Sequence, residues 1–501
     1  MIGEIVDDAE TFLNRLKMFL TSPPSGNFVE FEGRWWTGSE VAEAGLNLDK
    51  LLQEAGVPHD VAIGVVVRNR IGHACALWGL VGSGRSVVSL SSLQPDKMIV
   101  QDVENMRLGV VVAEESDWTE ALRATLSAGR IGVVINQGGI TSRLMEPAAL
   151  TLEDPLRRDT MSVTILTSGT TGVPKRFELG PGTLMKGKPM ISNADPTITG
   201  NQIEVHIHHF SSVGGILQML AYAAYRLPFC LLEKFEPHSW VAAVDRHGTR
   251  MLGIVPPIVR ALLAADLPPD ALKSVELFYG GGGALEPETI ARCEERFGLR
   301  VCWGYGATEF GGTVATWTRK TKDQFGDKPG SCGIAQPGFK TRIVDINTGE
   351  PLPAGEEGRL EVLASGISNE WIVTNDLAKM DDDGFLYILG RLDGAINRGG
   401  YKVLPEVVAS ALRRHPDVAE AVVFGIPDPR LGEIPVAAVE LRESAKPVTG
   451  DELRAFSRDH LIATSVPAEV RVYPRLPRSL TLKVDIPKLR SEWASGFAQA
   501  N

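Results

Sequence analysis

The sequence predicts an α/β protein, in which a large N-terminal domain of βα units surrounds mixed or parallel sheets and a small α+β domain follows. Short β-branched runs alternate with helical patterns, which is typical of parallel strands covered by helices. Three apolar runs end in glycine-rich loops, and ligands of open α/β sheets bind at such carboxyl ends, so we expect one crevice there. The β-branched runs are residues 61–67, 86–90, 108–113, 131–136 and 162–166.

The size and charge of the chain exclude several classes of protein. A chain of 501 residues is longer than one hydrophobic core usually organises, so we expect at least two domains. Hydrophobic residues make up 44% and charged residues 23%, the proportions of an ordinary globular protein. The net charge, 51 − 62 = −11, argues against a nucleic-acid binder or a membrane-surface binder.

The cysteines and the N-terminus predict a cytoplasmic protein. The five cysteines are odd in number, far apart and without a Cys-x-x-Cys pair, so we expect reduced thiols and no zinc site. The first ten residues are acidic and lack the apolar core of a signal peptide. Residues 214–232 are long enough to span a bilayer, but Arg226 and Pro228 interrupt them. We expect a buried helix over 214–226 and a strand over 229–232.

The character of the sequence changes after about residue 390, where a Gly- and Asp-rich hairpin pattern begins. A strand-rich passage of this length with its own helices indicates a separate small domain. We place the boundary near Arg391–Gly394 and divide the chain into domains 1–391 and 392–501. The elements expected in the second domain are a helix over 405–418, strands over 419–428 and 434–441, and a helix over 451–461.

One strand leads into a loop of glycines, hydroxyls and a lysine, TSGTTGVPK over residues 167–175. Glycines let backbone N–H groups approach a phosphate, and the hydroxyls and the lysine add donors and charge. The common P-loop is excluded, because these glycines are three residues apart and a proline precedes the lysine. The glycine runs at 280–283 and 304–312 do not fit the dinucleotide pattern G-x-G-x-x-G. Taken alone, the loop could also be a flexible surface turn.

Six collinear segments resemble the adenylate-forming superfamily, which includes acyl-CoA synthetases, luciferases and the adenylation domains of peptide synthetases. Any one of them could arise by chance, but six in the same order are specific. The segments are TSGTTGVPK (167–175), GGGGALEPE (280–288), GYGATE (304–309), KPGSCGIAQPGFKTRIVD (328–345), the block from TNDLAKM to LPEVV (374–408) and LPRSLTLKVD (476–485).

The resemblance implies an acyl-CoA synthetase that uses ATP, Mg²⁺ and CoA in two steps. A carboxylate attacks the α-phosphorus of ATP and gives an acyl-adenylate and pyrophosphate. The thiol of CoA then displaces AMP and leaves a thioester. Such chemistry needs positioned reactants and positive charge more than covalent help from the protein.

The resemblance also implies how the residues contact ATP. The 167–175 loop would hold the β- and γ-phosphates. Thr308 would donate to the α-phosphate, and Glu309 would ligate Mg²⁺, which prefers oxygen ligands. Tyr305 would stack on the adenine, and Asp376 would accept from both ribose hydroxyls. The implied ATP- and AMP-binding residues are Thr167, Ser168, Gly169, Thr170, Thr171, Gly172, Lys175, Gly282, Gly283, Ala284, Tyr305, Gly306, Thr308, Asp376 and Arg391.

In the C-terminal part, the resemblance implies a catalytic lysine and a hinge. Lys483 would bridge the acyl carboxylate and the α-phosphate in the transition state. Asp393 would be the hinge about which the small, mobile domain rotates between the half-reactions. Gly399 and Gly400, followed by Tyr401, would then leave room for the pantetheine arm of CoA.

Each of these residues also has a plain structural interpretation, such as a solvated glutamate, a capping threonine or a hairpin glycine. The context of six segments outweighs these interpretations. Three positions depart from the family pattern, and the usual Thr-His pair of the next helix is missing. Arg176 and Phe177 follow the lysine of the phosphate loop, and Leu482 replaces the glycine before Lys483. These departures bear on loop mobility more than on the chemistry.

Residues 204–216 occupy the position where relatives begin the acyl pocket. No acidic residue lies between His206 and Gln218, which argues against an amino-acid substrate. His206 and His208 would share one face of a strand and His209 the other, so a three-histidine metal site is geometrically poor. We expect a bulky hydrophobic acid, such as an aryl, alicyclic, terpenoid or fatty acid. The expected pocket residues are His209, Phe210, Val213, Gly214, Trp303, Gly311 and Gly312.

Two alternatives stay open at this point. The protein could be an acyl-adenylate ligase that loads a carrier-protein thiol or leaves thiolation to a partner. It could also be a nucleotide-binding homologue without catalysis, although Glu309, Asp376, Asp393 and Lys483 are all retained. The expected partners are a small hydrophobic carboxylic acid, with an acyl carrier protein and a homodimer left open, and no nucleic acid or membrane span.

Overall fold

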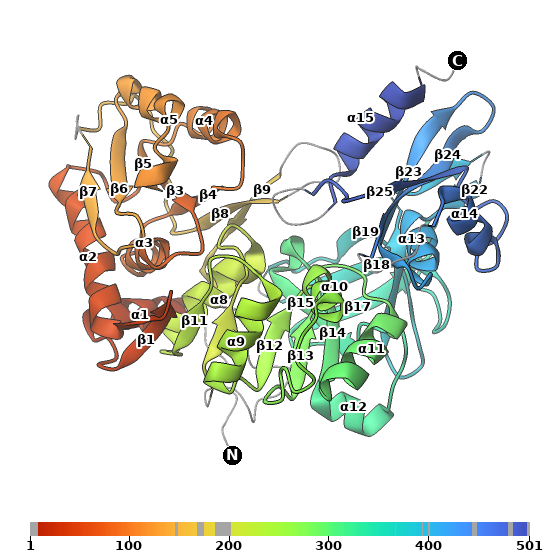
Figure 1. Ribbon diagram of the computed structural model, residues 1–501. Coiled ribbons are helices and arrows are strands. Elements are labelled where there is room, and N and C mark those ends of the chain that lie inside the picture. The colour runs from red at the N-terminus through yellow and green to blue at the C-terminus, as the bar shows by residue number, and fades with distance from the viewer. Residues whose placement is uncertain are drawn as a thin grey trace.

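The computed structural model describes residues 9–145, 149–167, 175–185, 202–365, 367–392, 394–398, 401–442, 448–478 and 484–497. In this part of the chain five β-sheets follow one another, with helices packed on them. Figure 1 shows the N-terminal sheet, in orange, and the C-terminal sheet, in blue, at opposite ends of the molecule, with a green sheet between them. The predicted α/β class, a large N-terminal domain with mixed sheets and a small C-terminal domain, is confirmed.

The largest sheet has seven strands in the order β7-β6-β5-β3-β4-β8-β9. Its five inner strands are parallel, and β7 and β9 add antiparallel edges. The inner strands are almost wholly buried, which explains why they read as unbroken β-branched runs. The strands are β3 (Ile63–Val67), β4 (Val87–Ser91), β5 (Val110–Glu114), β6 (Ile131–Ile135), β7 (Ser142–Leu144), β8 (Val163–Thr167) and β9 (Lys175–Leu179); the helices are α3 (Ile71–Gly82), α4 (Asp96–Asn105), α5 (Glu120–Ala124) and α6 (Pro181–Leu184).

A four-stranded sheet in the order β10-β11-β1-β2 links the N-terminal helices to the middle of the molecule. The apolar stretch near residue 220 forms a buried helix followed by a strand, as predicted. No helix of the described residues is long and apolar enough to cross a membrane. The elements are α1 (Ala9–Thr21), β1 (Asn27–Phe31), β2 (Arg34–Thr37), α2 (Gly38–Glu54), β10 (Glu204–His206), α8 (Val213–Ala224), β11 (Phe229–Leu231) and α9 (Pro237–His247).

The green sheet of Figure 1 carries two of the glycine-rich loops. Its strand order is β12-β13-β14-β15-β16. Strands β12, β13 and β14 are parallel, and β15 pairs antiparallel with both of its neighbours, β14 and β16. The elements are β12 (Met251–Ile254), α10 (Pro256–Ala264), β13 (Leu277–Gly280), α11 (Pro287–Phe297), β14 (Arg300–Ala307), the short 3₁₀ helix η3 (Thr308–Phe310), β15 (Gly312–Thr316), α12 (Arg319–Phe325) and β16 (Ile334–Ala335).

An antiparallel meander of four strands, in the order β17-β18-β19-β20, follows. No strand was predicted from the sequence over residues 339–380, whereas β20 falls within the predicted hairpin-like passage. The strands alternate between buried and more exposed residues, as a sheet with one buried face does. They are β17 (Phe339–Val344), β18 (Gly358–Ala364), β19 (Ile372–Met380) and β20 (Leu386–Arg391).

The C-terminal sheet has apolar clusters of its own around Val408 and Trp493. Its first strand, β21, begins at Ile396, shortly after the boundary that we predict near residue 391; the boundary itself stays a prediction. Helix α13 ends earlier than expected, at Arg413. The elements are β21 (Ile396–Arg398), β22 (Tyr401–Val403), α13 (Pro405–Arg413), β23 (Val418–Asp428), β24 (Gly432–Leu441), α14 (Gly450–Arg458), β25 (Glu469–Tyr473) and α15 (Ile486–Phe497).

The three strands that end in glycine-rich loops do not share one sheet, as a single crevice at one sheet edge would require. β8 belongs to the seven-stranded sheet, whereas β13 and β14 are neighbours in the green sheet. Strand β8 pairs antiparallel with β9, and the pairing ends with Thr167 opposite Lys175.

Candidate active site

Two of the glycine-rich loops meet at one edge of the green sheet. The parallel register aligns Ile254 with Gly280 and Gly280 with Trp303, so the chain leaves β13 and β14 on the same side. A side chain at Gly281 would place its Cβ 2.6 Å from the carbonyl oxygen of Gly304, closer than real Cβ atoms come. Glycine at this position allows the two backbones to lie against each other.

The segment Gly282–Ala284, which is expected to bind ATP, follows β13 and is open to solvent. Gly282, Gly283 and Ala284 are all exposed. Gly282 has a φ of 81°, in the left-handed region that glycine tolerates. The carbonyl of Gly283 accepts a hydrogen bond of 3.1 Å from the indole N–H of Trp303. Trp303 thus ties the exposed segment to the neighbouring strand.

At the end of β14 the chain turns through η3, which contains Thr308 and Glu309. Glu309 is exposed, and in the part of the chain that the structure describes it makes no ion pair. Gly306, just before the turn, lies so close to the backbone of Gly312 that a Cβ would come nearer than 3.0 Å to it. The turn is therefore held by β15, and it presents a carboxylate to solvent that fits an oxygen-preferring ion such as Mg²⁺.

Asp376 and Tyr305 come from different sheets and meet side by side. Asp376 lies in β19, opposite Arg391 of β20, and Nη1 of Arg391 is 3.6 Å from its Oδ1. The phenol of Tyr305, in β14, donates a short hydrogen bond to Oδ2 of Asp376. Burial and the neighbouring carboxylate raise the pKa of Tyr305 above its usual range, so the hydroxyl stays a donor. Three residues from three strands, and from two of the six sequence segments, are thus brought together.

Several predicted residues lie outside the described residues. They are Ser168, Gly169, Thr170, Thr171, Gly172, Leu482, Lys483, Asp393, Gly399 and Gly400. The described backbone places Thr167 at the end of β8, Lys175 at the start of β9, and Tyr401 at the start of β22. The roles of all these residues stay predictions.

The first of the departing residues, Arg176, has a structural partner. Its guanidinium lies 2.6 Å from Oδ1 of Asp102 in α4. Phe177 is paired with Ile165 of β8 and packs against the N-terminal core. Both residues therefore anchor the strand that follows the phosphate loop.

Residues 204–216, which are expected to begin the acyl pocket, are called the acyl segment here. Its three histidines make hydrogen-bond contacts within the protein. Nε2 of His206 lies 2.8 Å from the carbonyl oxygen of His208, and Nε2 of His208 lies 3.2 Å from that of Gly253. Nδ1 of His209 contacts Oγ of Ser211 at 2.6 Å. Burial lowers the pKa of His206 to about 3, and burial together with Arg68 lowers that of His209 to about 4. All three imidazoles are expected to be neutral at pH 7.

The expected pocket residues differ in how accessible they are. Phe210 is fully buried. Trp303 is 4% exposed, and Gly311 is buried. Val213 and Gly214, at the start of α8, and His209 are half-buried. The pocket roles of these residues, and of the half-buried Gly312, stay predictions.

Sequence reasoning missed a buried polar cluster beside the acyl segment. The hydroxyl of Tyr279 donates to Oε1 of Glu204 at 2.7 Å, and the amide of Gln218 donates to that hydroxyl at 3.4 Å. Burial raises the pKa of Glu204 to about 7, against the lowering effect of hydrogen bonds from Tyr279 and Tyr222. A glutamate opening an apolar strand, and a tyrosine directly before the glycine run, were the available signals.

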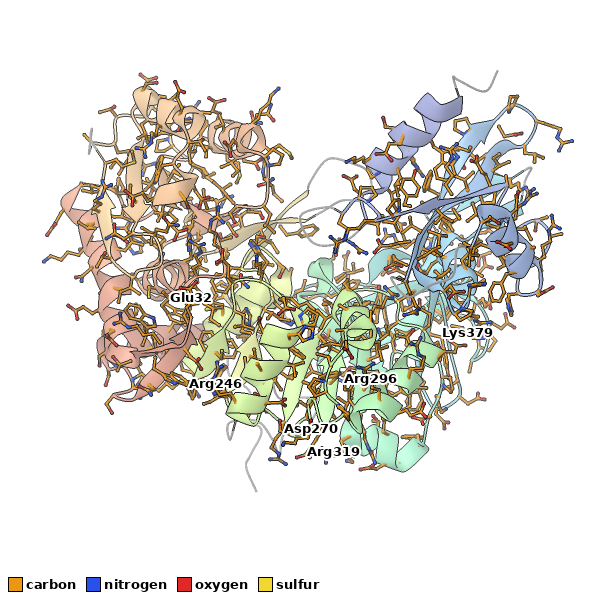
Figure 2. All side chains as sticks on the ribbon, in the orientation of Figure 1. Glu32, Arg246, Asp270, Arg296, Arg319 and Lys379 are labelled. Atoms are coloured by element: carbon orange, nitrogen blue, oxygen red, sulfur yellow. The ribbon has the colours of Figure 1, made fainter. Side chains whose placement is uncertain are left out.

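Glu30, Cys230 and His247 form a second buried group that resembles a metal site. Their ligand atoms all lie within 4.8 Å of one another. However, the guanidinium of Arg246 already donates to Oε1 of Glu30 at 2.7 Å, and His247 contacts the other carboxylate oxygen. Figure 2 shows Arg246 at the end of α9. A protein cation therefore already neutralises this carboxylate.

Comparisons with known proteins match both the N-terminal and the C-terminal part of the chain. Residues 19–369 match the AMP-binding enzyme family, and residues 408–483 match the AMP-binding enzyme C-terminal domain. The chain is 24% identical over 529 residues to 4-coumarate–CoA ligase-like 9 of Oryza sativa subsp. japonica, covering 98% of this chain and 92% of the relative.

Two solved structures have the same fold. ATP-bound MatB from Rhodopseudomonas palustris matches with a TM-score of 0.82 at 22% identity, over 96% of this chain and 98% of that one. O-succinylbenzoate coenzyme A synthetase from Bacillus subtilis, in complex with ATP and a magnesium ion, matches with a TM-score of 0.77 at 22% identity, over 94% and 98%. Since the family match spans more than half of the chain, the protein belongs to the AMP-binding enzyme family, among the AMP-forming acid–CoA ligases.

Proposed function

We propose that this protein activates a hydrophobic carboxylic acid with ATP, releases pyrophosphate, and transfers the acyl group from the acyl-adenylate to CoA. The observation that carries the proposal is the contact between Tyr305, Asp376 and Arg391, since the three belong to separate strands. An acidic side chain between an aromatic ring and a guanidinium suits an adenosine, with its flat base and paired hydroxyls.

The neighbouring turn supports binding of the metal–phosphate part of ATP. Exposed Glu309 would hold Mg²⁺, which supplies charge that stabilises the phosphates during transfer. A solved relative binds ATP together with a magnesium ion. The backbone of Gly282–Ala284 would border the adenine, and the 167–175 loop and Lys483 would contact the phosphates.

The residues of the acyl segment support a carboxylic acid whose acyl group is bulky and carries no ammonium charge. The segment holds neutral histidines, and its one acidic side chain, that of Glu204, accepts a hydrogen bond from Tyr279. No acidic residue lies between His206 and Gln218 to pair with a substrate ammonium group. Two relatives are named for acids that contain an aromatic ring, 4-coumarate and O-succinylbenzoate, which points the first assays to aryl acids.

The deciding experiment measures pyrophosphate release with ATP, Mg²⁺ and a panel of aryl, alicyclic, terpenoid and fatty acids, with and without CoA. We expect release that depends on one class of hydrophobic acid, and AMP plus a thioester only when CoA is present. Equal turnover of acetate and large acids would contradict the substrate class.

The acceptor is tested separately in the same assay. If pyrophosphate is released but no CoA thioester forms, a phosphopantetheinylated carrier protein replaces CoA. A thioester on the carrier alone would contradict CoA as the acceptor while leaving adenylation intact. The matched variants are Asp376→Asn and Asp345→Asn. We expect Asp376→Asn to lose most of its pyrophosphate release. Asp345→Asn should keep it, because Asp345 is a turn aspartate whose Oδ1 accepts from the backbone amides of Asn347 and Thr348.

A further inference from the structure

The hydroxyl of Tyr305 makes a contact that stacking on adenine does not need. A phenylalanine would stack equally well, but only a tyrosine can donate to the carboxylate of Asp376. The bond crosses between two sheets, from β14 of the green sheet to β19 of the meander. The ring itself is held by Phe310, whose centroid lies 6.2 Å away, so the hydroxyl is presented from a supported position.

Asp376 is oriented from several sides. Its backbone N–H donates to Oγ1 of Thr374 at 3.0 Å, and that hydroxyl donates to the carbonyl of Leu360 at 2.7 Å. Arg391 lies beside Oδ1, and Tyr305 donates to Oδ2. The backbone and both carboxylate oxygens thus have defined neighbours, and the side chain is almost fully buried.

The chemistry of a carboxylate allows Tyr305 and a ligand to bond at the same time. An ionised carboxylate has about four acceptor positions, so a bond from the phenol is compatible with bonds from two ribose hydroxyls. A hydrogen bond to a charged acceptor is also stronger than one between neutral groups. The phenol can therefore fix the carboxylate without displacing the ligand.

We propose that the hydroxyl of Tyr305 is a positioning group for nucleotide recognition: it holds Asp376 in the orientation that accepts the ribose hydroxyls. The proposal rests on the proposed ATP binding. Under this proposal the contact with the adenine and the contact with the ribose depend on each other, because the side chain of Tyr305 takes part in both. The carboxylate of Asp376 contacts the nucleotide, whereas the phenolic oxygen acts through it.

The test compares Tyr305→Phe with the wild type in calorimetric titrations with ATP and with 2′,3′-dideoxy-ATP, without any acid substrate. We expect the dissociation constant for ATP to rise about tenfold, the usual scale of a lost hydrogen bond to a charged group. For the dideoxy analogue we expect less than a twofold change, because Asp376 then has no ribose hydroxyl to accept.

Tyr387→Phe is the matched control. Tyr387 lies in β20, and its hydroxyl also donates to an aspartate, Oδ2 of Asp381, at 3.3 Å. Asp381 forms an ion pair with Lys328, and no nucleotide contact is proposed for it. We expect unchanged affinity for both nucleotides. In an Asp376→Asn background, adding Tyr305→Phe should bring no further loss of ATP affinity, because the carboxylate through which it acts is gone.

The outcomes separate this inference from the proposed function. A wild type that binds no ATP overturns both. A wild type that binds ATP, with Tyr305→Phe unchanged, overturns only the inference. Equal losses for ATP and the dideoxy analogue also overturn it, since the hydroxyl would then act on the fold or on the adenine. A loss confined to ATP supports it.

Discussion

At the scale of single residues, Glu204 makes stability depend on pH in a direction opposite to most carboxylates. Burial raises its pKa to about 7, from 4.5 in an unstructured chain. Between those values the folded protein binds more protons than the unfolded chain, so the free energy of unfolding falls as the pH rises from about 4.5 to 7. The contribution is complete below this window and is lost above it.

We predict that Glu204→Gln, which is neutral at every pH, is more stable than the wild type at pH 8. The pKa difference corresponds to roughly 3 kcal/mol in the free energy of unfolding, at about 1.4 kcal/mol per pH unit. At pH 4 the two proteins should be equally stable. Urea unfolding of both from pH 4 to 8 measures the difference, in which titration of the buried histidines cancels. A difference that does not change with pH contradicts the prediction.

The sequence identified residues of the site only where they belong to a segment with family spacing. Tyr305 and Asp376 were assigned to one ligand by resemblance, and the structure brings them into contact. Glu204 was missed because its partner, Tyr279, lies 75 residues away and no local pattern joins them. A single glutamate beside an apolar strand reads as a solvated residue until its surroundings are known.

At the scale of elements, the close approach of β14 and β15 sets the position of the turn at Thr308–Glu309. We predict that Gly306→Ala destabilises the protein by about 1–3 kcal/mol, the usual cost of overpacking. A Cβ at this position would come within 3.0 Å of the backbone of Gly312, so the strands must separate and move the turn. Pyrophosphate release should fall with it. Chemical unfolding and the release assay measure both effects.

Gly26→Ala is the control for that prediction. A Cβ on Gly26 would meet no atom within 4 Å, and the residue needs no left-handed backbone. We expect a change within about 0.5 kcal/mol, as for ordinary surface substitutions, and full activity. If Gly306→Ala behaves like Gly26→Ala, the tight strand contact does not position the turn.

Elements were predictable where one periodicity dominates. The bounds of the buried parallel strands β3, β4, β5 and β6 lie within two residues of the expected runs. A continuous β-branched run is typical of a strand that is buried on both faces of a parallel sheet. Strand β9 was missed, although Phe177 and Leu179 alternate with Arg176 and Glu178 in a period of two. The strands of the meander β17–β20 were not predicted as a sheet, because they mix buried and partly exposed residues and lack a continuous β-branched run.

At the scale of the whole molecule, a cluster of ion pairs joins the C-terminal residues to the green sheet. Glu286, just before α11, contacts Arg413 of α13 and lies 3.2 Å from Arg260 of α10. Arg260 and Arg413 lie 2.8 and 3.3 Å from Glu420 of β23. Burial alone would raise the pKa of Glu286, but the two guanidinium groups outweigh it and lower that pKa. Two domains were predictable from composition, but these contacts join residues more than 120 positions apart.

We predict that Glu286→Gln loosens the docking of the C-terminal residues on α10 and α11. The change removes one of the two carboxylates that Arg260 and Arg413 share and leaves them Glu420. Removing one partner of a buried ion pair costs on the order of 3 kcal/mol. Small-angle X-ray scattering should show a larger radius of gyration for the variant. Glu288→Gln is the control, because Glu288 lies 3.7 Å from Arg414 with both side chains about half exposed, and such pairs contribute little. Identical scattering from the two variants would mean that apolar contacts, and not the ion cluster, hold the C-terminal sheet against the rest of the molecule.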